Sequence, residues 1–140
     1  MQRIPTILLV DDDETTNFLH QRLLLRLHVC DQVLVAGNGA QALEILAQPN
    51  GPFSPTNPVL VLLDLNMPVM DGFEFLEAVR ALPAAQQQSA VIVVLTSSMH
   101  TQDLDRANHL PIAGFLNKPL NQEKVDSLRH IHFGRQGTAE

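Results

Sequence analysis

The stretch Ile7-Leu8-Leu9-Val10-Asp11-Asp12-Asp13-Glu14 joins four apolar residues directly to four acids. Its apolar half is short and continuous, which predicts a strand that is buried on both faces. Three further apolar runs also end in a polar or charged side chain: residues 59–63 end at Asp64, residues 90–95 at Thr96, and residues 112–116 near Lys118. Each of the four runs therefore carries a chemically useful group at its carboxyl end.

The segments between these runs have the length and the capping residues of helices. Residues 15–28 place Leu19, Leu23 and Leu27 four residues apart, which predicts an amphipathic helix with these leucines facing the core. Asn38 and Asp71 are followed three residues later by Gln41 and Glu74, the spacing of a capping box. Two more helices are expected over residues 101–109 and, after Asn121, up to residue 130, and one more strand over residues 32–36.

The chain thus repeats a strand–helix pair five times, which predicts an α/β fold with a parallel sheet and helices on both faces. In open sheets of this kind, ligands bind outside the carboxyl ends of the strands. We therefore expect five side chains to share one pocket: Asp11, Asp12, Asp64, Thr96 and Lys118.

The composition fits one globular domain and disfavours several classes of protein. The chain has 140 residues, 45% of them hydrophobic, and a formal charge of −6, which disfavours general nucleic-acid binding. No apolar run approaches the roughly 20 residues that cross a bilayer, and the single Cys30 excludes an intrachain disulfide and fits a cytoplasmic protein. We expect one domain over residues 1–133, a frayed tail over residues 134–140, and an extended loop over the proline-rich residues 49–58.

The charges of the expected pocket suggest its chemistry. Carboxylates that are forced together repel unless a cation joins them, and an all-oxygen ligand set suits Mg²⁺. A lysine and a threonine hydroxyl at neighbouring strand ends can hold a phosphate, and an aspartate can itself attack phosphorus. The residues therefore predict a Mg²⁺-dependent aspartyl phosphorylation site with Asp64 as the acceptor.

Four blocks of this sequence resemble the receiver domains of two-component response regulators. They are Ile7 to Glu14, Leu62-Leu63-Asp64-Leu65-Asn66-Met67-Pro68-Val69-Met70-Asp71-Gly72, Leu95-Thr96-Ser97, and Gly114-Phe115-Leu116-Asn117-Lys118-Pro119. The resemblance implies a doubly wound, flavodoxin-like (βα)5 fold with a five-stranded parallel sheet in the order 2-1-3-4-5. Within the family, the chain is most similar to stand-alone regulators of the chemotaxis type.

The resemblance also implies a role for each matching residue of the metal and phosphoryl site. Asp64 would take a phosphoryl group from a kinase histidine, Asp12 would ligate Mg²⁺ directly, and Asp11 would hold the ion through water. Asn66 would lend its backbone carbonyl to the metal. Lys118, before a bond to Pro119 that is usually cis in the family, would pair with Asp64.

Two further residues match the family's switch positions. Thr96 resembles the hydroxyl that moves to the phosphoryl group, and Phe115 the aromatic ring that moves inward with it. The implied partners are a sensor histidine kinase or a histidine phosphotransfer protein, and a downstream protein target. Because the chain ends shortly after the fifth helix, we expect a signalling domain that acts through another protein, without nucleic-acid binding or membrane insertion, and not an enzyme in the strict sense.

An alternative reading starts from the same acids. Asp11, Asp13 and Thr15 fit the D-x-D-x-T nucleophile motif of haloacid-dehalogenase-type phosphatases. That reading leaves Asp64 and the residues around it unexplained, and Glu123 and Asp126 do not form the further acidic pair it needs. Capping or solvent exposure is expected for Asp13, and the six histidines are read as structural or solvated.

Overall fold

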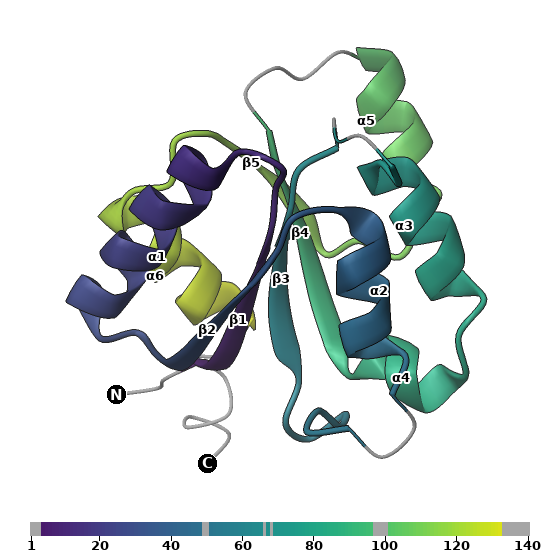
Figure 1. Ribbon diagram of the computed structural model, residues 1–140, viewed down its shortest axis with the longest axis horizontal. Coiled ribbons are helices and arrows are strands. Elements are labelled where there is room, and N and C mark those ends of the chain that lie inside the picture. The colour runs from purple at the N-terminus through teal and green to yellow at the C-terminus, as the bar shows by residue number, and fades with distance from the viewer. Residues whose placement is uncertain (1–3, 49–50, 66, 68, 97–100, 133–140) are drawn as a thin grey trace.

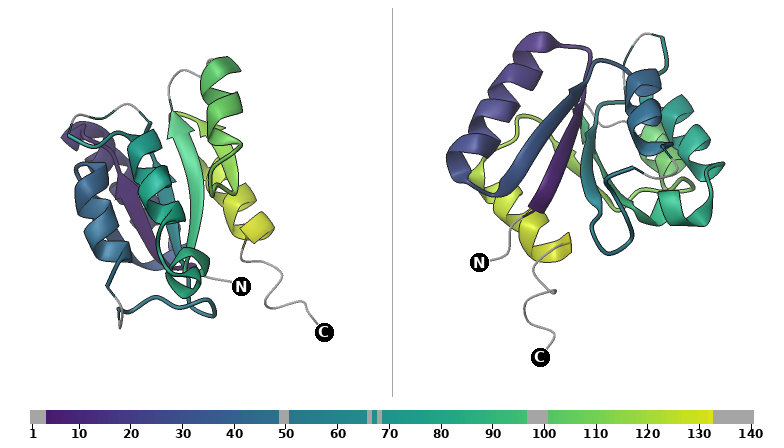
Figure 2. Two further views of the ribbon diagram at one scale, coloured as in Figure 1. Left: turned by 90° about the vertical axis from the view of Figure 1, so that its right-hand side faces the viewer. Right: turned by 60° about the horizontal axis from the view of Figure 1, so that its bottom comes forward.

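The computed structural model describes residues 4–48, 51–65, 67, 69–96 and 101–132, which form a parallel sheet between two layers of helices (Figures 1 and 2). The elements in chain order are β1 (Ile4–Val10), α1 (Glu14–Leu27), β2 (Cys30–Ala36), α2 (Gly39–Leu46), β3 (Val59–Leu63), α3 (Gly72–Arg80), α4 (Ala84–Gln88), β4 (Ala90–Thr96), α5 (Thr101–Ala107), β5 (Gly114–Asn117) and α6 (Gln122–His132).

The sheet order is β2-β1-β3-β4-β5 and every neighbouring pair is parallel, which confirms the predicted fold. Alternate residues of the central strands face opposite layers. Leu8 and Val10 of β1 pack toward α2 and α3, whereas Ile7 and Leu9 pack toward α1 and α6. Burial on both faces explains why these strands read as continuous apolar runs.

The buried face of α1 differs from the predicted one. Leu19 is 55% exposed, and the residues that point inward are Asn17, His20 and Leu24. Leucines surround this helix on most sides, so their spacing did not single out the face that packs. The expected leucine stripe is therefore wrong at Leu19, although Leu23 and Leu27 pack at the edge of the core.

Helix caps largely follow the prediction. Asp71 and Glu74 form a complete capping box at the start of α3. Asn38 caps α2 by accepting from the Gln41 backbone N–H at 2.9 Å, but the Gln41 side chain accepts from the Gly37 N–H instead of returning to Asn38. The second capping box is thus only half formed.

The proline-rich connection before β3 is less extended than expected. Ser54 and Asn57 exchange two backbone hydrogen bonds, of 3.2 and 2.9 Å, so the chain turns back on itself there. The short helix α4 was not predicted.

The expected tail lies outside the described residues, and the domain boundary at residue 133 stays a prediction. None of the described helices combines the length and apolarity needed to span a membrane.

Candidate functional site

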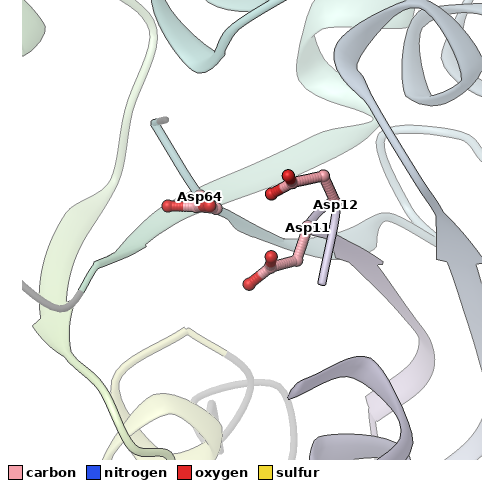
Figure 3. Close-up of side chains that lie close together, drawn as sticks. All are labelled: Asp11, Asp12 and Asp64. Atoms are coloured by element: carbon pink, nitrogen blue, oxygen red, sulfur yellow. The ribbon is translucent and has the colours of Figure 1, made fainter. Parts of the chain in front are cut away.

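Three carboxylates meet at the carboxyl ends of β1 and β3. Asp11 and Asp12 follow β1, and Asp64 follows β3; one oxygen from each lies within 4.8 Å of the others. Val10 and Leu63 are register partners, so the residues after them are neighbours, and the Asp64 N–H donates to the Val10 carbonyl at 2.9 Å. Figure 3 shows the three side chains extending to the same side of the strand ends. The structure therefore brings together the three acids that the sequence predicted.

The three acids are not equally exposed. Asp11 and Asp64 are only 5% and 8% exposed, whereas Asp12 is open to solvent. Like charges at this separation destabilise one another unless a cation lies among them. The arrangement thus combines two buried carboxylates with one that solvent can reach.

Lys118 supplies a cation to this cluster. Its Nζ donates to Asp11 Oδ2 at 2.5 Å and lies 3.9 Å from Asp64 Oδ2. The resemblance implied a pair with Asp64. The ammonium lies within 4 Å of both buried carboxylates, and Asp11 is the closer of the two. The Lys118–Pro119 bond is cis, as the resemblance implied.

Gly72 brings the start of α3 against the backbone around Asp64. A Cβ atom on Gly72 would lie 2.7 Å from the Leu65 Cα and 2.8 Å from the Asp64 carbonyl oxygen, closer than real side chains pack. The Gly72 N–H donates to the Leu65 carbonyl at 3.0 Å. A glycine is therefore needed for α3 to support the loop that carries Asp64.

Two buried polar residues of α1 reach the site, and sequence reasoning missed both. The Asn17 side chain donates to the Asp11 carbonyl at 2.8 Å, and its own oxygen has no hydrogen-bond partner within the described part of the chain. His20 is 7% exposed and interacts electrostatically with Lys118 and Asp11. Burial, and then the nearby Lys118, lower the pKa of His20. The available signal was the three-residue spacing of Asn17 and His20 on one helical face.

Asp13 serves as the cap of α1, as expected. Its carboxylate accepts from the Thr15 N–H at 3.1 Å and from the Thr16 hydroxyl at 2.6 Å. The hydrogen bond from Thr16, followed by those from the backbone, lowers the pKa of Asp13. Both Asp13 oxygens thus serve the helix, which leaves the phosphatase reading without its second acid.

The remaining predicted residues are placed only in part. Thr96 ends β4 opposite Asn117, so its backbone reaches the same edge of the sheet, but its side chain is outside the described set. Asn66 also falls outside it. Phe115 lies on β5, half-buried against the α2 and α3 layer.

The donor set fits a divalent cation. Three carboxylate oxygens within 4.8 Å of one another offer hard ligands only, which suit Mg²⁺ or Mn²⁺. Asp11, Asp12 and Asp64 are the residues that would hold it. The neighbouring ammonium of Lys118 adds a positive charge on the side of Asp11 and Asp64, so the site could bind an anionic group beside such a cation.

The chain has clear relatives among known proteins. The sequence model of the response regulator receiver domain matches residues 7–128. A probable chemotaxis protein CheY of Rhizobium etli is 34% identical over 128 residues, which are 91% of this chain and 92% of the relative. The crystal structure of chemotaxis protein CheY4 of Vibrio cholerae superimposes with a TM-score of 0.71 at 27% identity, covering 91% of this chain and 98% of that one. The Mn²⁺-bound structure of the response regulator Rcp1 gives a TM-score of 0.69 at 28% identity, covering 91% and 93%.

Proposed function

Because the chain belongs to the response regulator receiver family, and is therefore a phosphoacceptor domain of two-component signal transduction, we propose that Asp64 is the residue that accepts the phosphoryl group. One observation carries this assignment. Asp64 is a buried carboxylate at the end of the central strand β3, with carboxylate oxygens of Asp11 and Asp12 within 4.8 Å and the Lys118 ammonium 3.9 Å away. It is thus the carboxylate that both the metal ligands and the lysine can serve.

The proposed reaction is a transfer between two nucleophiles. An oxygen of Asp64 attacks phosphorus and forms the new O–P bond, while the P–N bond to the donor histidine breaks and its electron pair returns to the imidazole, which takes up a proton. Lys118 can shift from the carboxylate of Asp64 to the phosphoryl oxygens, since its ammonium already lies within 4 Å of that residue. Thr96 and Phe115 are assigned to the switch that follows.

We assign Mg²⁺ to the acid cluster, with Asp12 as direct ligand, Asp11 through water, and Asp64 and the Asn66 carbonyl as further ligands. When bound, the ion would offset the repulsion between the attacking carboxylate and the anionic phosphoryl donor. The hard oxygen set supports this choice. The Mn²⁺ in Rcp1 is a property of that protein.

The surface beside the acid cluster supports a protein partner as phosphoryl donor. Phe18 and Leu19 lie about one turn into α1 and are 60% and 55% exposed, next to the end of the sheet that carries Asp12. Neighbouring exposed apolar side chains can form part of a protein-binding surface. We assign this surface to a histidine kinase or a histidine phosphotransfer protein, met in the cytoplasm. The phosphorylated protein would then act on a downstream protein target, so its role is signalling and not substrate turnover.

The test is covalent phosphorylation by acetyl phosphate, followed by intact-protein mass. The wild type should gain one phosphoryl group when Mg²⁺ is present and none in EDTA. Asp64→Asn should abolish the gain, whereas Asp11→Asn should slow it. The phosphatase alternative requires the opposite ranking, in which Asp11→Asn alone abolishes covalent labelling.

A further inference from the structure

A second lysine, Lys124, donates hydrogen bonds to the backbone on both sides of Lys118. The Nζ of Lys124, in the first turn of α6, donates to the Asn117 carbonyl at 2.6 Å and to the Pro119 carbonyl at 3.0 Å. These are the residues immediately before and after Lys118. One ammonium therefore fixes both flanks of the residue whose own ammonium lies between Asp11 and Asp64.

Helix stability does not explain a lysine at this place. A cation in the first turn opposes the helix dipole, which favours acids there. Asn121 already accepts from the Lys124 backbone N–H at 2.9 Å, so the start of α6 is capped without the side chain. The long side chain is instead directed back to the β5–α6 connection. The two contacts with carbonyl groups account for its presence.

The chain holds only two lysines, Lys118 and Lys124, and both act at this connection. Lys118 has to reach from the end of β5 across β4 to the acids that follow β3 and β1. Ordering a side chain with four rotatable bonds costs conformational entropy, and a fixed backbone leaves fewer conformations to be restricted. We propose that Lys124 is a positioning residue for Lys118: by binding the Asn117 and Pro119 carbonyls it keeps the Lys118 ammonium aimed at the phosphoryl site. This inference rests on the proposed function of that site.

The first measurement requires neither metal nor phosphoryl donor. In protein labelled with ¹³C and ¹⁵N at lysine only, Lys124→Met leaves Lys118 as the single lysine signal. We expect the two Hε protons of Lys118 to have distinct shifts in the wild type and to converge in Lys124→Met, because the side chain then samples several rotamers. Lys124→Arg, which can also donate to two carbonyls, should keep the shifts distinct. Unchanged Lys118 signals in Lys124→Met would overturn the inference.

The second measurement is a double-mutant cycle on the rate of phosphorylation by acetyl phosphate. Lys124→Met should slow the wild type about tenfold, the lower end of what the loss of hydrogen bonds to a charged group costs, and should have almost no effect in a Lys118→Ala background. Equal slowing in both backgrounds would show a general structural role and contradict the proposal. Arg129→Met, which removes a positive charge from the same helix near Asp126, is the matched control and should leave the rate unchanged.

The two measurements separate this inference from the proposed function. If acetyl phosphate labels no form of the protein, the assignment of Asp64 fails, and the lysine spectra still report whether Lys124 fixes Lys118. If the wild type is labelled and Lys124→Met is labelled equally fast, the positioning role alone fails.

Discussion

The two ends of the sheet are built from the same strands and differ in almost every other respect. At the carboxyl end, three carboxylates and an ammonium crowd together. At the amino end, a cavity of about 200 Å³ is lined by uncharged residues only: Ile45, Leu46, Gln48, Gly51, Phe53, Ser54, Pro55, Ala85, Gln86 and Ser89. There the polar groups serve packing; the Ser89 hydroxyl, for example, donates to the Ala85 carbonyl at 2.6 Å.

The difference follows from the direction of the strands. In a parallel sheet all strand-to-helix connections leave from one end, and helix N-termini gather there. Asp13, Asn38, Asp71 and Asn121 all accept from backbone N–H groups at that end. Helix α4 begins at the other end, after Pro83, and has no side-chain cap. The carboxyl end of the sheet therefore carries the charged groups and the capped helix N-termini, whereas the cavity at the amino end is lined by uncharged residues.

The largest expected effect compares one polar residue from each end. Lys118→Ala should slow phosphorylation by acetyl phosphate about 100-fold, the typical loss when a charge-stabilising donor is removed from a reaction site. Ser89→Ala, at a position only 6% exposed, should change that rate less than about twofold while lowering stability by about 1 kcal/mol. A rate loss in Ser89→Ala as large as in Lys118→Ala would remove the distinction between the two ends.

Phe18→Ala tests whether the surface beside the acids receives the donor protein. Phosphotransfer from a cognate phosphohistidine protein should slow about tenfold, as expected when an aromatic anchor is truncated, while labelling by the small donor acetyl phosphate should not change. Ile131→Ala is the control, because Ile131 is similarly exposed, at 61%, near the end of α6. Equal effects of both substitutions would argue against a docking surface on α1.

Removal of Mg²⁺ should lower the free energy of unfolding, because the ion is expected to bind only at the cluster of Asp11, Asp12 and Asp64. At Mg²⁺ ten times its dissociation constant, binding to the native state should add about 1.4 kcal/mol, or roughly 5 °C in Tm. Asp12→Asn should lose this gain, and the exposed position of Asp12 means that the substitution leaves no cavity. Sodium chloride at equal ionic strength controls for screening. A full Mg²⁺ response in Asp12→Asn would exclude this residue as a ligand.

Helix caps should matter more at the acid end than at the opposite end. Asp71→Ala removes the capping box of α3 and should lower the free energy of unfolding by about 1 kcal/mol in urea titrations. Pro83→Ala, at the uncapped start of α4, should stay within about 0.5 kcal/mol. If the two substitutions proved equally costly, capping would not distinguish the ends.

The smallest expected effect is a pH dependence from His20. Burial and Lys118 lower its pKa below the ordinary 6.5, so the unfolded chain binds a proton where the folded chain does not. The contribution of neutral His20 to the free energy of unfolding is therefore complete above about pH 6.5, and it declines as the pH falls from there toward the pKa of His20 in the folded protein. His20→Gln should flatten this part of the Tm profile, and an unchanged slope would assign the decline to another group.

Much of the site could be predicted because strand ends in a parallel sheet are fixed by topology. The apolar runs before Asp11 and Asp64 were enough to place both acids at one edge, whatever the details of packing. The face of α1 was not predictable in this way, because leucines occupy several of its sides and tertiary contacts decide which of them are buried. This is why Asn17 and His20 were missed.

Contacts between side chains that are far apart in the sequence could not be predicted from it either. The closer pairing of Lys118 with Asp11 joins residues 107 positions apart and depends on where the ammonium settles between two carboxylates. The role of Lys124 depends on the path of the β5–α6 connection. The sequence therefore predicts which groups gather at this edge, and the structure decides which of them bind each other.

The most direct test of the central claim is to locate the phosphoryl group. The protein is phosphorylated with acetyl phosphate and Mg²⁺, the acyl phosphate is reduced with borohydride, and the peptides are mapped by mass spectrometry. The account predicts a single reduced residue, at Asp64. Reduction at Asp11 or Asp12, with Asp64 unmodified, would contradict it.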